Sequence, residues 1–317
     1  MRIAIVGAGS IGGAIAHALA LTGHDPVVVA RGATKAALER DGFTVTRAGR
    51  IEKSAPRVVA DPAQAGVQDM VIGALKAHDW PGAVGLFAPL MGPDTLLMPA
   101  INGLPWWYFQ RQGGAHDGKR IAAVDPAGTL SRFFDPARIV GTVVYMAVSR
   151  PAPGHLSWPT GERLVIGDVD AATGNAERAA VPLRAAGLNV EITPDIRNAM
   201  WLKLVNNASF NPISVLARGG VATMLANPEL RAMGSAAMRE IVELSQAVGC
   251  KVEVDIDARI ESMHRLGDFK SSMLQDFEAG RSMEIGPLIE APRELGRLTG
   301  VSTPVLDELS ARMKAYA

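Results

Sequence analysis

Several features that would mark a particular class of protein are scarce or missing in this sequence. The single cysteine, Cys250, cannot form an internal disulfide, which fits a reducing compartment. Thirty-two basic residues balance 32 acidic ones, so no net field favours nucleic acid or an anionic membrane. No stretch approaches the roughly 18 apolar residues of a membrane span, and no signal peptide precedes the first glycines. We therefore expect a cytoplasmic protein.

The length and texture of the chain indicate two domains. At roughly 150 residues per domain, 317 residues are enough for two hydrophobic cores. The first part alternates short apolar runs with helical stretches, which is typical of a doubly wound, mainly parallel sheet. Strands are expected at 2–6, 26–30, near Val45, and at 58–59, 69–73, 96–97, 121–124 and 139–148. An antiparallel pair, 139–149 with 163–166, is expected as an addition to the sheet edge.

The pattern changes to helices after Pro194. Helical spacing with little β character covers 195–217, 228–248, 255–266 and 287–298. Prolines stand near several of the expected helix starts, where a missing N–H costs least. We therefore place one domain at residues 1–192 and an all-α domain at 193–317.

A glycine-rich motif follows the first expected strand. It reads Gly7-Ala8-Gly9-Ser10-Ile11-Gly12 and opens a helical run that ends near Thr22. In this context the first glycine permits the tight turn, the second lets the backbone approach a pyrophosphate, and the third lets the helix pack on the sheet. The alternative is a purely structural turn. The motif predicts an N-terminal Rossmann dinucleotide-binding domain, and hence an α/β fold class overall.

The residue after the second expected strand indicates which dinucleotide binds. NAD sites usually carry an acidic residue there for the ribose 2′-hydroxyl, whereas an arginine suits the 2′-phosphate of NADP. Here the strand ends at Arg31, and no acidic residue follows until Glu39. The alternative is a solvated surface arginine beside a turn. We therefore expect NADPH or NADP as the cofactor.

Polar residues recur on one face of an otherwise apolar helical segment. Lys203, Asn207 and Asn211 stand at i, i+4 and i+8, close to one stripe. Asparagine is a mediocre helix former, so two of them one turn apart suggest hydrogen bonds to a ligand. A lysine alone would more often be a surface residue. These residues alone do not decide between binding and structure.

Other candidate residues have plausible structural roles. Ser271 or Ser272 would serve as a helix cap, and Asn102 would sit in a turn. Lys76 follows a strand, at the edge where doubly wound sheets bind ligands. The six histidines show no metal-ligand spacing, so no metal is expected.

Together these motifs resemble the ketopantoate reductase (2-dehydropantoate 2-reductase) family along essentially the whole chain. The resemblance rests on GAGSIG with Arg31, LKAHD around Lys76, ING around Asn102, WLKLVNNASFNP around Lys203, and KSSMLQD followed by GRSMEI ending at Glu284. It implies a Rossmann domain, a helical domain, and an active site between them. The implied reaction is NADPH-dependent reduction of a 2-keto acid, with ketopantoate as the first candidate, in pantothenate biosynthesis.

The resemblance also implies roles for individual residues. Lys203 would protonate the carbonyl oxygen as hydride arrives, and Glu284 would orient Lys203 and a substrate hydroxyl. The remaining assignments are Asn207, Asn211 and Ser272 for substrate and Lys76 and Asn102 for the cofactor side. General-acid catalysis of this kind contributes about 10²–10⁴-fold to the rate.

One departure from the family pattern leaves the substrate open. Four consecutive aromatic residues, Trp106 to Phe109, follow the Asn102 motif where the family has small residues. They either pack in a core or reshape the substrate pocket. Ser282-Met283 also replaces the family's usual pair. A paralogous reductase of a bulkier 2-keto acid is therefore an alternative.

Two other functions compete with this interpretation. An opine-type or 3-hydroxyacid dehydrogenase shares the domain plan, but the KSSMLQD and Glu284 motifs argue against it. A non-catalytic NADP(H) sensor would not need the stripe that begins at Lys203. The expected partner is a small 2-keto acid, not nucleic acid or a membrane. The sequence leaves the oligomeric state open, with a homodimer as the candidate assembly.

Overall fold

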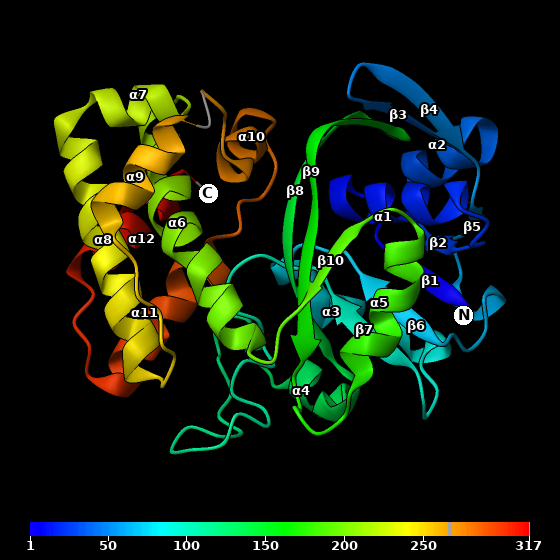
Figure 1. Cartoon of the computed structure of the whole chain (residues 1–317), viewed down its shortest axis with the longest axis horizontal. Coiled ribbons are helices and arrows are strands. Elements are labelled where there is room, and N and C mark those ends of the chain that lie inside the picture. The colour runs from blue at the N-terminus through cyan, green and yellow to red at the C-terminus, as the bar shows by residue number, and fades with distance from the viewer. Residues whose placement is uncertain (266–267, 317) are drawn as a thin grey trace. The chain divides into compact units, whose positions relative to one another are not determined.

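The computed structural model describes residues 1–265 and 268–316 (Figure 1). The chain forms two compact units, and neither is one uninterrupted stretch. Unit 1 consists of Met1–Ile101, Phe109–Gly118 and Gly128–Ile196, and unit 2 of Asn102–Tyr108, Lys119–Ala127 and Arg197–Ala317. Two short segments from the first half of the chain thus belong with the C-terminal helices. The division of the sequence at residue 192 stays a prediction.

The first sheet of unit 1 is entirely parallel. Its order is β5-β2-β1-β6-β7, with β1 Ile3–Val6, β2 Val27–Val29, β5 Arg57–Val59, β6 Met70–Gly73 and β7 Leu96–Pro99. All residues of β1, β2, β6 and β7 are buried, as expected of short apolar strands covered on both faces. The chain turns from β1 to β2 on one side and places β6 on the other. This arrangement confirms the doubly wound sheet and makes β1–β6 its switch point.

A second sheet corrects the expected edge addition. It contains β3 Phe43–Arg47, β4 Arg50–Ser54, β8 Val140–Ala152, β9 His155–Asp168 and β10 Asn189–Ile192, in the order β10-β9-β3-β4 with β8 paired to β9. The antiparallel hairpin β8–β9 was predicted, and it is the long pair in the middle of Figure 1. However, β9 is long enough to pair with β3 at its start and β10 at its end. A single bridge, Leu97 to Ile139, links the hairpin to the first sheet.

Helices complete unit 1. They are α1 Ser10–Leu21, α2 Gly32–Asp41, α3 Trp80–Phe87, α4 Thr129–Phe133 and α5 Asn175–Ala185, with 3₁₀ turns at Pro62–Gln64, Ala77–Asp79, Ala88–Leu90 and Pro136–Arg138. Helix α1 packs against β1 of the first sheet and against the second sheet, so both sheets contribute to one hydrophobic core. A Cβ at Gly13 would lie only 3.0 Å from Phe43 on β3 and 3.1 Å from Leu156 on β9. The strand expected at 121–124 is wrong, since those residues form turns.

Unit 2 is helical. Its elements are α6 Ile196–Ala217, α7 Val221–Ala226, α8 Pro228–Ala247, α9 Ile256–Arg265, α10 Ser272–Glu278, a π-helix Gly286–Glu290, α11 Ala291–Thr299 and α12 Pro304–Lys314. The helices predicted at 195–217, 228–248 and 287–298 are confirmed to within one or two residues at each end, the last as the π-helix and α11 together. The helix predicted at 255–266 is confirmed from Ile256 to Arg265, and its predicted last residue lies outside the described residues. Helices α8 and α12 both carry proline at the first position. No described helix is long and apolar enough to cross a bilayer.

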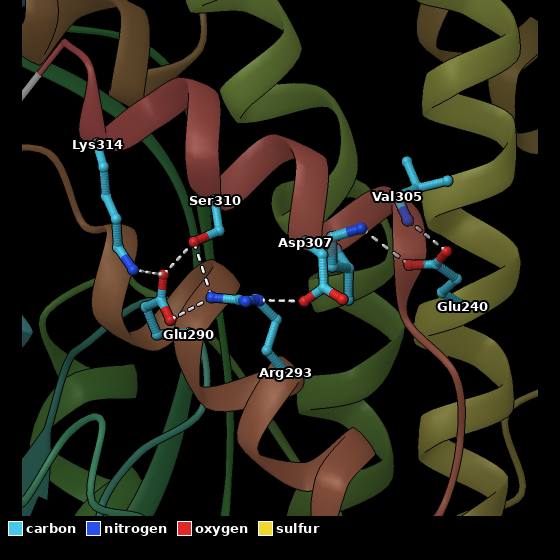
Figure 2. Close-up of polar contacts among 8 residues, drawn as sticks. Glu240, Glu290, Arg293, Val305, Asp307, Ser310 and Lys314 are labelled. Carbon is cyan, nitrogen blue, oxygen red and sulfur yellow. Dashed lines mark hydrogen bonds and ion pairs between the residues drawn. The ribbon is translucent and has the colours of Figure 1, made fainter.

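Charged contacts fix the last helices of unit 2 (Figure 2). The Glu290 carboxylate accepts hydrogen bonds from Ser310 at 2.5 Å and Arg293 at 2.7 Å, and Lys314 lies 3.0 Å away. Arg293 also donates to Asp307 on α12 at 2.6 Å. We call these five residues the Glu290 cluster. It ties the end of the π-helix to α11 and α12.

The start of α12 is held separately. The Glu240 carboxylate on α8 accepts hydrogen bonds from the backbone N–H groups of Val305 and Leu306, at 2.8 and 3.0 Å (Figure 2). These are two of the donors that a helix start leaves without an intrahelical partner. The negative charge there also complements the helix dipole.

Candidate active site

The glycine motif forms the connection from β1 to α1. Gly7 adopts φ +101°, a conformation that favours glycine. A Cβ at Gly12 would lie 2.0 Å from the carbonyl oxygen of Gly7, which no larger residue could tolerate. At Gly9, by contrast, nothing lies within 4 Å of a built Cβ. Gly7 and Gly12 therefore close the turn, while Gly9 leaves open space above the backbone.

This turn lies at the switch point of the first sheet. A Cβ at Gly7 would meet the carbonyl oxygen of Ala74 at 2.8 Å, so the loop after β6 lies against it. Ala8 is buried, and Ser10 and Ile11 begin α1 half-buried. Lys76 stands two residues after Ala74, at the start of a 3₁₀ turn. The N-terminus of α1 and the carboxyl end of β6 thus meet where dinucleotides bind in this fold class.

Arg31 occupies the position expected from the sequence. It follows β2, is exposed, and stands immediately before α2 in an extended conformation. The first turn of α2 carries no acidic residue. The residues present therefore fit a dinucleotide, with an arginine and no acidic residue at the end of β2.

Three of the predicted site residues meet in unit 2. The Lys203 ammonium donates a hydrogen bond to Asn102 Oδ1 at 2.7 Å, and Asn102 Nδ2 lies 3.4 Å from Glu284 Oε2. We call Asn102, Lys203 and Glu284 the Lys203 cluster. Asn102, which the family resemblance placed on the cofactor side, thus bridges the two charged residues.

The backbone explains how Asn102 reaches Glu284. Gly103 has φ +79°, and a Cβ there would lie 2.5 Å from the carbonyl oxygen of Pro287. That same carbonyl accepts a hydrogen bond from Leu104 N at 3.0 Å. The loop after Asn102 is therefore docked on the π-helix that follows Glu284. A side chain at position 103 would separate them.

The environment of Lys203 changes its acidity. Burial lowers the pKa of Lys203 to about 8, although the Glu284 carboxylate acts in the opposite direction. A lysine with this pKa holds its proton at neutral pH and releases it more readily than an ordinary lysine. Such groups occur preferentially at functional sites, because general acids work best with a pKa near the operating pH.

The other predicted substrate residues lie on α6 and α10. Asn207 is half-buried and Asn211 buried, one and two turns beyond Lys203 on α6, and the helix continues through Pro212. Ser272 is exposed and is the first residue of α10, while Ser271 is its N-cap and accepts a hydrogen bond from Leu274 N. The substrate-binding roles of Asn207, Asn211 and Ser272 stay predictions.

Two contacts near these residues carried no signal in the sequence. Ser271 Oγ lies 2.5 Å from Ser214 Oγ, which joins the start of α10 to α6. On α9, Arg259 donates to the Leu202 carbonyl at 3.0 Å and to Asn206 Oδ1 at 2.9 Å. These contacts join α6 to α9 and to the start of α10. They link residues more than 50 positions apart, so no local pattern could reveal them.

The aromatic run belongs to the core. Trp106, Trp107, Tyr108 and Phe109 are each at most 2% exposed. Tyr108 Oη accepts a hydrogen bond from the indole of Trp201 on α6 at 2.7 Å, and Cys250 Sγ lies 3.5 Å from it. Burial raises the pKa of Tyr108, so this hydroxyl stays neutral. The packing interpretation of these residues fits their burial.

Among the described residues, no cluster of side chains suited to a metal ion is present.

Comparison with known proteins identifies the family. The family model described as "Ketopantoate reductase PanE/ApbA" matches residues 3–171, and its C-terminal counterpart matches residues 195–317. A 2-dehydropantoate 2-reductase of Mesorhizobium japonicum is 39% identical over 100% of this chain and 98% of its own length. A second relative of that name, from Archaeoglobus fulgidus, is 25% identical over 96% of both chains.

Solved structures agree with this assignment. A putative ketopantoate reductase from Ralstonia solanacearum superposes with a TM-score of 0.95 at 36% identity, covering 100% of this chain and 97% of that one. A 2-dehydropantoate 2-reductase from Geobacter metallireducens gives 0.88 at 26% identity, with both chains covered completely. The fold likeness extends to a D-mandelate dehydrogenase, with a TM-score of 0.84 at 20% identity. The chain therefore belongs to the ketopantoate reductase family, a family of pyridine-nucleotide-dependent oxidoreductases.

Proposed function

We propose that this protein reduces 2-dehydropantoate (ketopantoate) to pantoate with NADPH. The observation that carries the proposal is the Lys203 cluster, in which the half-buried Lys203, with its lowered pKa, donates a hydrogen bond to Asn102 beside Glu284. The family membership of the chain and the names of its full-length relatives support the same reaction. The physiological setting that follows is pantothenate biosynthesis.

Lys203 acts as the general acid of this reaction. NADPH, when bound, supplies a hydride to the keto carbon. The carbonyl oxygen then gains negative charge, which the Lys203 ammonium stabilises before transferring a proton from Nζ to that oxygen. Asn102 aims the ammonium through its 2.7 Å hydrogen bond, and Glu284 favours the charged form. Asn207, Asn211 and Ser272 bind the substrate's polar groups, with Ser272 on its carboxylate.

The cofactor proposal rests on unit 1. The open space at Gly9 accommodates a pyrophosphate. The backbone N–H groups at the start of α1 are suited to bind its negative charge. Arg31, before an α2 turn without acidic residues, favours a 2′-phosphate over a free hydroxyl. This supports NADPH in preference to NADH.

The homodimer expected as an assembly stays a prediction.

The buried aromatic run bears on the choice of substrate. A bulkier 2-keto acid was the alternative if Trp106 and Trp107 reshaped the pocket. Their exposure of 1% and 2% supports a packing role, which removes that reason for preferring a larger substrate. A nucleotide sensor would have no use for the Lys203 cluster.

A substrate panel tests the proposal. NADPH oxidation is followed at a fixed enzyme concentration with ketopantoate, pyruvate, 2-oxoisovalerate and phenylglyoxylate. We expect the highest kcat/KM with ketopantoate. A preference for phenylglyoxylate would replace the substrate but keep the reaction class. NADPH binding without turnover of any keto acid would contradict the assignment of Lys203 as an acid.

A further inference from the structure

A second arginine, on a strand far from Arg31 in the sequence, reaches the start of α2 with its side chain. Arg150, near the end of β8, donates a hydrogen bond from Nη1 to Thr34 Oγ1 at 3.1 Å. Thr34 is in the first turn of α2, three residues after Arg31. Both elements belong to unit 1. No sequence pattern singles out Arg150, which lies 119 positions after Arg31.

The β8–β9 turn explains this approach. Gly154 in that turn has its carbonyl oxygen bonded to Thr44 N at 2.9 Å. A Cβ built at Gly154 would lie 3.6 Å from Leu38 and 3.7 Å from Ala37, both on α2. The tip of the hairpin therefore packs along α2. Arg150, four residues before Gly154, is carried to the first turn of the same helix.

The charges around this turn are unbalanced. In the described part of the chain neither Arg31 nor Arg150 forms an ion pair, whereas Lys35 is neutralised by Glu39 at 2.6 Å. The first turn of α2 contributes no acidic residue. Arg150 thus contacts the first turn of α2, the helix that Arg31 immediately precedes, and no acidic side chain of the described residues pairs with either arginine. This is the arrangement expected where an anionic ligand supplies the missing charge.

We propose that Arg150 is a specificity-determining residue that binds the 2′-phosphate of the cofactor together with Arg31. Thr34 uses one guanidinium N–H and fixes the orientation of the group, which leaves the other N–H donors for phosphate oxygens. A planar guanidinium held in this way matches a phosphate by paired hydrogen bonds. The inference rests on the proposed function and assigns part of its preference for NADPH to β8.

Two adenosine nucleotides isolate this role from catalysis. Binding of adenosine 2′,5′-bisphosphate and adenosine 5′-monophosphate is measured by calorimetry for the unmodified protein and for Arg150→Met. The methionine retains an apolar stem and removes the guanidinium. We expect about tenfold weaker binding of the bisphosphate and unchanged binding of the monophosphate, since only the bisphosphate carries the 2′-phosphate that the guanidinium would bind.

Matched variants distinguish a direct contact with the 2′-phosphate from a general effect of positive charge on nucleotide binding. Arg50→Met removes the same charge from an exposed position on β4 of the same sheet, and should leave both affinities within twofold. Thr34→Val removes the hydroxyl that holds Arg150 and should weaken only the bisphosphate, by a few-fold. Thermal unfolding of each variant checks that unit 1 remains folded.

Each outcome decides the proposal. Selective loss of bisphosphate binding in Arg150→Met, absent in Arg50→Met, supports it. Equal losses for both nucleotides, or no loss, would overturn it and leave Arg150 as a structural link between β8 and α2. If the unmodified protein itself fails to prefer the bisphosphate, NADPH specificity is wrong as well, and that failure is recognised before any variant is made.

Discussion

Two carboxylates border the same π-helical segment of unit 2, and their surroundings differ sharply. Glu290, at its end, is held by Arg293, Ser310 and Lys314 at 2.5–3.0 Å. Burial acts to raise the pKa of Glu290, but these hydrogen bonds and charges outweigh it and hold the pKa below its ordinary value. Glu284, before the segment, lies 3.4 Å from the amide of Asn102 and within the electrostatic reach of Lys203.

The lysines of the two clusters show the same contrast. Lys314 is largely exposed beside Glu290, so it keeps most of its hydration. Lys203 is buried deeply enough that its pKa falls to about 8 despite Glu284. Structural charge pairs lower the free energy of the fold, whereas groups with strongly shifted pKa values occur preferentially at functional sites. Under the proposed function, we therefore expect the Glu290 cluster to contribute to stability and the Lys203 cluster to contribute to the reaction.

Removing the lysine of the Lys203 cluster tests this division with the largest expected effect. Lys203→Met should lower kcat by a hundredfold or more, because the carbonyl oxygen loses its proton donor. The dissociation constant of NADPH should stay within twofold. Steady-state kinetics and fluorescence titration of NADPH measure the two quantities. Thermal unfolding of the variant checks that unit 2 remains folded.

Lys251→Met is the matched control, because Lys251 is an exposed lysine of the same unit. It should leave kcat and Tm unchanged. If Lys203→Met instead weakened NADPH binding and spared kcat, Lys203 would be a binding residue. The chemical half of the comparison would then be wrong.

The Glu290 cluster should respond in stability and not in rate. Glu290→Gln removes the charge that faces Arg293 and Lys314, and should lower the free energy of unfolding by about 1–3 kcal/mol at neutral pH. Because the folded-state pKa of Glu290 is lowered, this contribution is present above its unfolded pKa and is lost as pH falls through the folded value. Thermal unfolding at pH 7 and pH 4 measures both effects.

Glu308→Gln provides the control, since Glu308 pairs with Arg312 on the exposed face of α12. Exposed pairs of this kind contribute about 0.3–0.5 kcal/mol. A tenfold fall in kcat for Glu290→Gln, with Tm unchanged, would show that the two clusters act as one site.

Sequence patterns predicted what local chemistry determines. The glycine motif, Arg31 after the second strand and the helices beyond residue 195 follow from spacing and from residue type. The second sheet could not be predicted in this way, because its strands pair over long sequence separations and β9 changes neighbours along its length. The bridge from Asn102 to Lys203 and Glu284 also depends on a long-range contact, the docking of Gly103 on Pro287. Residue identities could nominate these three side chains, but only the fold joins them.

The smallest effect is expected in the pH dependence of the reaction, and it distinguishes an acid from a structural cation. With saturating NADPH, kcat/KM for the keto acid should be level below about pH 7, fall to about half near pH 8 and be about tenfold lower at pH 9, because Lys203 loses its proton through a pKa of about 8. Oxidation of the hydroxy acid needs the neutral amine, so its kcat/KM should rise through the same pKa.

Protein stability should follow a related but separate course. Between about pH 8 and the ordinary lysine pKa of 10.5, the unfolded chain binds the Lys203 proton more tightly than the folded protein does. The contribution of Lys203 to the free energy of unfolding should therefore rise across this window. The mirrored rate profiles cannot arise from this stability change, because unfolding would move both directions together. A parallel fall of both rates would thus make Lys203 a structural charge like those around Glu290.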